Sequence, residues 1–458
     1  MFVPDLVVRS RRVVTPRGTR PGAVHVGKGR ILGILDPNEV PPGCPVDEAG
    51  DAFVLPGLVD ASVHVGGSGL ASRDGLEATT RAAAAGGVTT VIAMPFDGAP
   101  PTTSAAALEA VRRAAEGRCF VDVGFWGGVV PDNLGQIAAL ASAGGLGFAC
   151  DLASWVEGHP ATVGASLRAA MPPLARIGAP LVVHAELPGP IDHAAARRRA
   201  PPSWMSRLRA LRRRGQRYAA YLERRPRAGE NDAVALVIEL CREFRVPTHI
   251  ASLSSSDALT PIFHARSAHL PLSAGTCPHY LYFAADEIPD GAVEYTALPP
   301  IRERPNRELL WAALAGGLVE LVASDHRPAP ASRGSGRFVD TRPGIASLHL
   351  SLSIVWTEAR ARGYTLEQVA HWMCRAPARL AGLTRKGAID VGYDADLVVF
   401  DPDRSLRVEA DRRSDRPALT PYEGRALRGA VQRTYLRGNL VCRDGQPGPR
   451  ACGRFVLR

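Results

Sequence analysis

Residues 78–95, ATTRAAAAGGVTTVIAMP, contain one unit of the pattern that decides the fold. The stretch begins with an alanine-rich segment of helical character over 78–86 and ends with a β-branched, apolar run over 87–95. A helical segment next to a short apolar run, with glycines between them, is typical of the repeating unit of a parallel sheet. The same alternation continues along most of the chain.

Further apolar runs follow, and most are separated by segments long enough to form a helix. They are CFVDVGFWG (119–127), LGFACDLA (146–153), APLVVHAE (179–186), VPTHIASLSS (246–255), LPLSAGTCPHY (270–280) and LVELVASDH (318–326). Parallel strands need crossover connections, which are usually helices. Seven or eight such units predict an α/β protein with a TIM (β/α)8 barrel over residues 56–380.

The two ends of the chain have a different pattern. Residues 1–55 and 381–458 consist of short β-branched runs interrupted by turn residues, as in LVVRSRRVVTPRG (6–18) and ADLVVFDPD (395–403). Such runs are typical of strands joined by tight turns. We therefore expect the two ends to pair into one small β-sandwich domain, with residues 1–55 and 381–458 as its two parts.

Composition narrows the class of protein. The 458 residues are 46% hydrophobic and 22% charged, which is an ordinary globular balance. The sequence contains no apolar stretch long enough for a membrane helix, and from its first residues we expect no secretory signal. The eight cysteines are scattered and form no C-x-x-C pair, so we expect reduced thiols and a cytoplasmic protein.

The positive charge is concentrated in one segment. Twelve arginines and one acidic residue, Glu223, lie between Arg197 and Arg227, giving this segment +11 where the whole chain carries +10. Sequence signatures of nucleic-acid binding do not accompany it. We expect an exposed helical arm that serves solubility or contact between subunits of a homo-oligomer, with neither nucleic acid nor membrane as a partner.

The predicted strand ends resemble a known family. VLPGLVDASVHV (54–65) is similar to the first-strand signature of the amidohydrolase superfamily, in which Pro-Gly precedes Asp-x-His-x-His. VDVGFWGGVVPDN, VVHAE, HIASLSS, TCPHYL, LPPIR and VASDHRP follow in the order of the cyclic-amidohydrolase branch. Allantoinase is the most similar member, followed by hydantoinase, dihydropyrimidinase and dihydroorotase. The resemblance implies hydrolysis of a C–N bond in a cyclic amide or ureide, a small-molecule substrate, and two divalent metals bridged by a carboxylated lysine.

Only part of the ligand set that the resemblance implies is present. The first-strand pair is reduced to His64, because the position of its partner is occupied by Ser62. The histidine of VHAE is His184, and the late aspartate is Asp325. Three candidate metal ligands therefore remain, which predicts at most one divalent metal, such as zinc, or none.

The other two ligand positions lack the metal-binding side chains of the family. Ser252 occupies the position of the histidine in the HLSS motif, and strand alternation predicts that His249, three residues earlier, faces away. Ala149 occupies the position of the bridging lysine. Because the only lysines are Lys28 and Lys386, a different alignment does not supply this amine.

Two hypotheses remain open. The first is an enzyme that acts on a C–N bond of a cyclic amide or ureide, by hydrolysis or the reverse cyclisation, with Asp325 and His184 as catalytic residues. The second is an inactive homologue that binds a ligand or supports a partner subunit. Ordinary two-zinc hydrolysis is disfavoured by the lost ligands. Candidate substrate-binding residues are Tyr280, Arg302 and Asp151, of which Asp151 is also a candidate replacement ligand or a plain turn residue.

Overall fold

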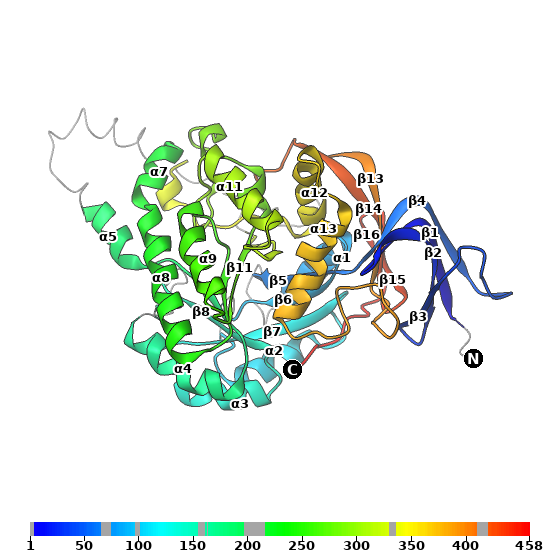
Figure 1. Cartoon of the computed structure of the whole chain (residues 1–458), viewed down its shortest axis with the longest axis horizontal. Coiled ribbons are helices and arrows are strands. Elements are labelled where there is room, and N and C mark those ends of the chain that lie inside the picture. Colours follow the sequence, from blue (N-terminus) through cyan, green and yellow to red (C-terminus); the bar gives the residue numbers. More distant parts are fainter. Residues whose placement is uncertain are drawn as a thin grey trace.

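The computed structural model describes residues 4–65, 75–96, 101–153, 161–162, 164–196, 216–328, 336–409 and 420–458. Two sheets organise these residues, one from the middle of the chain and one from its two ends. In Figure 1 the middle of the chain lies to the left, and the strands from the ends lie to the right.

The middle of the chain forms the predicted barrel. Eight strands lie side by side in sequence order, each hydrogen-bonded in parallel to the next. They are β5 Leu58–Val63, β6 Val88–Ala93, β7 Asp122–Gly128, β8 Gly147–Asp151, β9 Leu181–His184, β10 Thr248–Ala251, β11 Leu272–Thr276 and β12 Leu321–Val322. A parallel bridge between Val63 and His326 joins the last strand's extension to the first. The prediction of a TIM barrel is confirmed.

Helices connect these strands and surround them (Figure 1). Between successive barrel strands lie α1 Gly75–Ala85, α2 Ala105–Ala115, α3 Ile137–Ser142, α4 Ala165–Ile177, α8 Arg227–Phe244, α9 Leu259–Ser267 and α11 Arg304–Ala315. Shorter or later helices are α5 Pro188–Ala196, α7 Tyr218–Arg224, α10 Pro278–Tyr282, α12 Ser351–Ala361, α13 Leu366–Ala370 and α14 Ala376–Leu380. The alanine-rich stretch that opened the sequence argument lies in α1, and every residue of the next strand, β6, is buried.

The second sheet is built from both ends of the chain, as predicted. Its strand order is β16-β15-β14-β13-β4-β1-β2-β3, so β4 and β13, from opposite ends of the sequence, are neighbours. The N-terminal strands are β1 Leu6–Thr15, β2 Gly18–Gly27, β3 Arg30–Leu35 and β4 Val46–Pro56. The C-terminal strands are β13 Leu397–Arg407, β14 Ala426–Leu436, β15 Asn439–Arg443 and β16 Gln446–Pro447. This sheet has its own apolar core, and β4 leads within two residues into the first barrel strand.

Two composition-based expectations can be followed in the structure. All eight cysteines are free, in agreement with the prediction of reduced thiols. Among the described helices, none is long and apolar enough to cross a membrane. Residues 197–215 of the arginine-rich segment lie outside the described residues, so its expected exposed helix stays a prediction. At its end, Arg225 pairs with Glu186 and Arg227 pairs with Glu303.

Candidate active site

The carboxyl ends of the barrel strands bring four candidate residues to one end of the barrel. His64 directly follows β5, Asp151 ends β8, His184 ends β9 and Asp325 follows β12. Each is buried or nearly so. In enzymes of this fold the chemistry lies at this end, because eight loops with variable side chains meet there. We call this end of the barrel the mouth.

Asp325 and Ser252 share an unusual backbone conformation. Their φ angles are 47° and 53°, in the left-handed region that residues with a side chain rarely adopt. Ser252 follows β10 and Asp325 follows β12. The Asp325 side chain lies at the mouth, and the Ser252 side chain lines a small cavity below it. Such backbone strain is concentrated at functional sites, which makes this ring of strand ends the candidate site.

Asp325 lies within a small cluster of side chains from the first and last strands. Its Oδ1 accepts a hydrogen bond from Ser62 Oγ at 3.3 Å and lies 3.3 Å from His64 Nε2. The guanidinium of Arg327 donates through Nη2 to that same His64 Nε2 at 2.8 Å. Since a guanidinium nitrogen only donates, Nε2 must be the acceptor in this contact, and the imidazole proton then lies on Nδ1.

The electrostatics of Asp325 follow from these contacts. Burial alone would raise the pKa of Asp325, but the hydrogen bonds and positive charge around the carboxylate, including the charge of Arg327, lower it to about 2. Opposite charges and hydrogen bonds that favour the carboxylate outweigh the cost of removing it from water. Asp325 is therefore an ionised carboxylate at neutral pH.

A second cluster lies beside the first. Asp151 and His184 are register partners on β8 and β9, and Asp151 Oδ1 lies 3.5 Å from His184 Nδ1. On the other side of the ring, His184 Nε2 lies 3.1 Å from the Leu298 carbonyl oxygen. Burial alone would lower the pKa of His184, but Asp151 raises it to about 9, so the pair is an imidazolium and a carboxylate. Burial alone would raise the pKa of Asp151, but His184 and Arg327 outweigh this effect and lower it.

The positions that lack metal ligands lie together below the mouth. Ser62 and Ser252 line one small cavity of about 10 Å³, which is roughly the room that one water needs. Ala149 is fully buried in an apolar cluster inside the barrel, next to Val182 and Trp126. The histidines and the lysine that the resemblance implies at these three positions would all extend into this region.

The prediction that His249 faces away from this cavity is wrong. His249 lines the same cavity as Ser252 and bonds through Nδ1 to Ser273 Oγ at 2.8 Å. Strand alternation holds only to Ala251, where β10 ends, and the left-handed backbone at Ser252 then turns its side chain to the same side. Burial lowers the pKa of His249 to about 3, so the ring is neutral.

Another grouping of possible metal ligands lies at the mouth. One ligand atom from each of Cys277, His279 and Asp325 lies within 4.8 Å of the others. Among the described residues neither ring nitrogen of His279 has a hydrogen-bond partner, although the residue is 1% exposed. Burial raises the pKa of the Cys277 thiol well above its ordinary value, whereas a metal binds the thiolate.

Tyr280 and Arg302 lie behind the mouth. Tyr280 is buried and donates through its hydroxyl to the Pro299 carbonyl oxygen at 2.6 Å. Arg302 is buried as well, donates to the Arg225 carbonyl oxygen and lies 3.7 Å from Glu230. In these positions both side chains hold the loop at 298–302, and their expected contact with substrate stays a prediction.

Arg327 is the residue that sequence reasoning missed. The signal was available, because Arg327 stands two residues after Asp325 in the strand-end motif VASDHRP. A positive charge so close to Asp325 could have suggested that an arginine takes the place of the missing metal ions.

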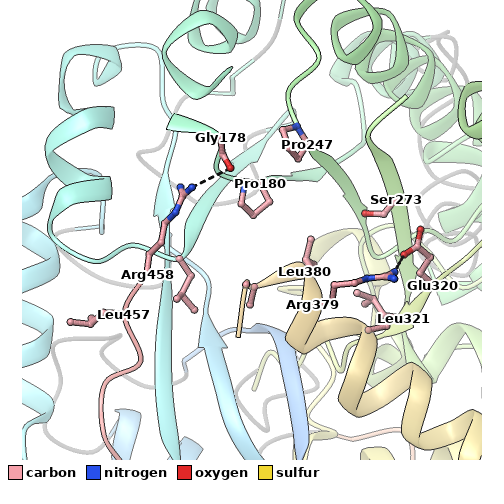
Figure 2. Close-up of a pocket in the computed structure, with 14 residues that line it drawn as sticks. Gly178, Pro180, Pro247, Ser273, Glu320, Leu321, Arg379, Leu380, Leu457 and Arg458 are labelled. Carbon is pink, nitrogen blue, oxygen red and sulfur yellow. Dashed lines mark hydrogen bonds and ion pairs between the residues drawn. The ribbon is translucent and has the colours of Figure 1, made fainter. Parts of the chain in front are cut away.

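The opposite end of the barrel has a cavity of a different character. A cavity of about 490 Å³ there is lined by residues that precede or begin the strands, among them Pro180, Pro247 and Leu321. Figure 2 shows Arg379 paired with Glu320, and Arg458 at the chain end donating to the Gly178 carbonyl oxygen. Its lining has no imidazole or thiol, so we place the chemistry at the mouth.

The fold and the mouth define an amidohydrolase: residues 53–441 match the Amidohydrolase family, and the chain belongs to that family. Within it the chain is allantoinase-like. It is 42% identical to the allantoinase of Streptomyces avermitilis over 96% of both chains. It is 36% identical to the allantoinase of Arabidopsis thaliana, over 98% of this chain and 90% of that one. An L-hydantoinase (dihydropyrimidinase) from Arthrobacter aurescens superposes with a TM-score of 0.89 at 29% identity, over the full length of both.

The two-metal centre that the family resemblance implies does not fit the residues present. Ser62 Oγ is bonded to Asp325, and the methyl group of Ala149 offers no ligand atom. His64 Nε2 already accepts from Arg327, and both ring nitrogens of His184 face protein oxygens. We therefore derive no step through a pair of metals.

Proposed function

We propose that this chain acts on a C–N bond of a cyclic ureide of the allantoin type, by hydrolysis or the reverse cyclisation, without a carboxylated-lysine two-metal centre. The observation that carries the proposal is the convergence of His64, His184 and Asp325 at the mouth. The substrate class rests on the similarity to the allantoinases along nearly the whole chain.

The residues at the mouth supply the parts that ring opening requires. Water forms a bond to the ring carbonyl carbon, the C–N bond breaks and the ring nitrogen takes up a proton. The Asp325 carboxylate can orient the attacking water and accept its proton as the new bond forms. The cations Arg327 and His184 can stabilise the charge that develops on the carbonyl oxygen.

The cofactor belongs to the same proposal. Catalytic zinc sites have about three protein ligands, and the three surviving family positions come from what were two separate sites. We propose no metal, or at most one divalent ion such as zinc. Cys277, His279 and Asp325 are the group that a single ion would favour among the described residues.

One observation favours the alternative of an inactive, ligand-binding or partner subunit. Each of the three surviving residues already contacts another protein group, so the mouth is electrostatically satisfied without substrate. In either case we propose a cytoplasmic homo-oligomer. The free cysteines and the basic segment at 197–227 support that part of the proposal.

The test is ring opening of allantoin, hydantoin and dihydropyrimidine by the full chain, with and without a chelator. The proposal predicts turnover that Asp325→Asn abolishes while the fold is kept. The chelator should leave this turnover unchanged if no metal is bound, and should remove no more than one ion per chain otherwise. An absence of turnover in either direction, with intact folding, would favour the inactive homologue. Turnover that the chelator removes together with two metal ions per chain would show that the ligands are wrongly assigned.

A further inference from the structure

The mouth contains a cation at a place where the family resemblance requires metals. Arg327 Nη2 lies 2.8 Å from His64 Nε2, which is also the ring nitrogen that faces Asp325 and so the one that would bind a metal held by both residues. A zinc–nitrogen bond is about 2.0–2.1 Å long, so one nitrogen lone pair does not serve a zinc ion and this guanidinium together. The arginine and a metal at His64 therefore exclude each other.

Arg327 also connects the first and last strands of the barrel. Its backbone follows β12, and its guanidinium contacts His64, which follows β5 and whose Nε2 lies 3.3 Å from Asp325 Oδ1. The backbone of Arg327 is held in place by a hydrogen bond, because its N–H donates to the Ile345 carbonyl oxygen at 3.1 Å.

We propose that the guanidinium of Arg327 replaces the two metal ions as the positive charge of the mouth, and that it binds the carboxylate of an open-chain ureido acid. This inference rests on the proposed function, since it names the ligand class of the same site. Within the described residues, the contact with His64 uses one of the five guanidinium N–H groups. A planar pair of N–H donors matches the two oxygens of a carboxylate, whereas a cyclic ureide offers only single carbonyl oxygens.

The contacts at the mouth agree with this ligand. Asp151 pairs with His184, and Asp325 lies beside His64, which Arg327 contacts, so each carboxylate already has a neighbouring partner. Arg327 is only partly buried, and the proposal places its accessible part at the outer edge of the guanidinium. A carboxylate that reaches this edge gains a charge-assisted contact without removing either internal pair.

The experiment uses chelator-treated full-length protein and isothermal titration calorimetry. The probe is N-carbamoylglycine, the open-chain ureido acid, and hydantoin is the matched cyclic compound. We expect wild type to bind the acid at least tenfold more tightly than hydantoin, with an affinity that falls as salt rises. Arg327→Met should remove at least tenfold of the acid's affinity and change hydantoin binding little, whereas Arg327→Lys should retain part of it.

Two controls separate the outcomes. Arg404→Met changes an exposed arginine far from the mouth and should leave binding unchanged, and melting temperatures verify that each variant is folded. Equal binding of N-carbamoylglycine by wild type and Arg327→Met would overturn this inference, as would tighter binding after zinc is added. Binding as expected without any turnover would count against the proposed function alone.

Discussion

A lysine and an arginine of this chain lie near carboxylates in two different settings. At the junction of the barrel and the terminal sheet, Lys386 Nζ lies 2.6 Å from Asp396, 2.9 Å from Asp122 and 3.4 Å from Asp394. At the mouth, Arg327 contacts His64 and lies near Asp325. The lysine is almost completely buried, whereas the arginine is partly exposed.

On our proposal, this difference distinguishes a structural charge cluster at the junction from a functional one at the mouth. Burial alone would lower the pKa of Lys386, but Asp396 and Asp122 raise it, so the amine stays charged and saturated by carboxylates. These partners come from β7 and from the residue before β13, so the cluster fastens the sheet to the barrel. Arg327 has fewer partners and lies at the end where the strand ends converge, which leaves it able to meet a ligand.

The largest effect on stability is expected at the junction. Lys386→Met leaves the buried Asp396 without its cation and removes one of the two cations beside the buried Asp122, and breaking a buried pair in this way costs about 3–5 kcal/mol. Urea unfolding should show this loss. Lys28→Met changes the only other lysine, which is exposed, and should stay within about 0.5 kcal/mol of wild type. Equal midpoints for the two variants would show that the junction cluster is not structural.

The mouth should require several simultaneous changes before it binds metal. Because the ligands of a metal pair act as one unit, we expect Ser62→His, Ala149→Lys and Ser252→His together, with zinc and bicarbonate, to restore metal uptake and some hydrolysis. Adding Arg327→Ala should raise zinc uptake further, because it frees His64 Nε2 from its contact with the guanidinium. Elemental analysis measures the uptake. Zinc content that Arg327→Ala lowers would contradict the exclusion of metal by arginine.

The buried neutral histidine below the mouth predicts a pH dependence of stability. The folded-state pKa of His249 is about 3 and its ordinary value is about 6.5. The unfolded chain therefore binds one more proton between these values, and stability is present above pH 6.5 and lost as pH falls toward 3. Each pH unit should cost about 1.4 kcal/mol for this group. His249→Asn should reduce the slope of unfolding free energy against pH by that amount, whereas His193→Asn, at an exposed position, should not.

The smallest effect is expected from a single reversion. Ser62→His alone restores the first-strand pair but leaves Ala149 and Ser252 without ligands. Zinc content and ring opening should match those of wild type. A single reversion that creates chelator-sensitive hydrolysis would mean that the remaining ligands are supplied by other residues of the chain.

The comparison also indicates what sequence could reveal. The barrel followed from strands that are buried over their full length, as in VTTVIA of β6, because such runs are distinctive of parallel sheets. The missing amine at Ala149 was visible, because the chain has no lysine between Lys28 and Lys386. The orientation of His249 was predicted wrongly, since the left-handed backbone at Ser252 ends the alternation and carries no local sequence signal. The contact of Arg327 with His64 joins opposite ends of the barrel sequence and requires the closed fold.

The central claim is that the mouth works with a guanidinium where the family has metals. Elemental analysis of the full-length wild-type protein, grown and purified with excess zinc and bicarbonate, tests it most directly. The account predicts far less than two zinc ions per chain, because Ser62, Ala149 and Ser252 supply no ligands and Arg327 occupies His64. Two tightly bound zinc ions per chain would contradict it.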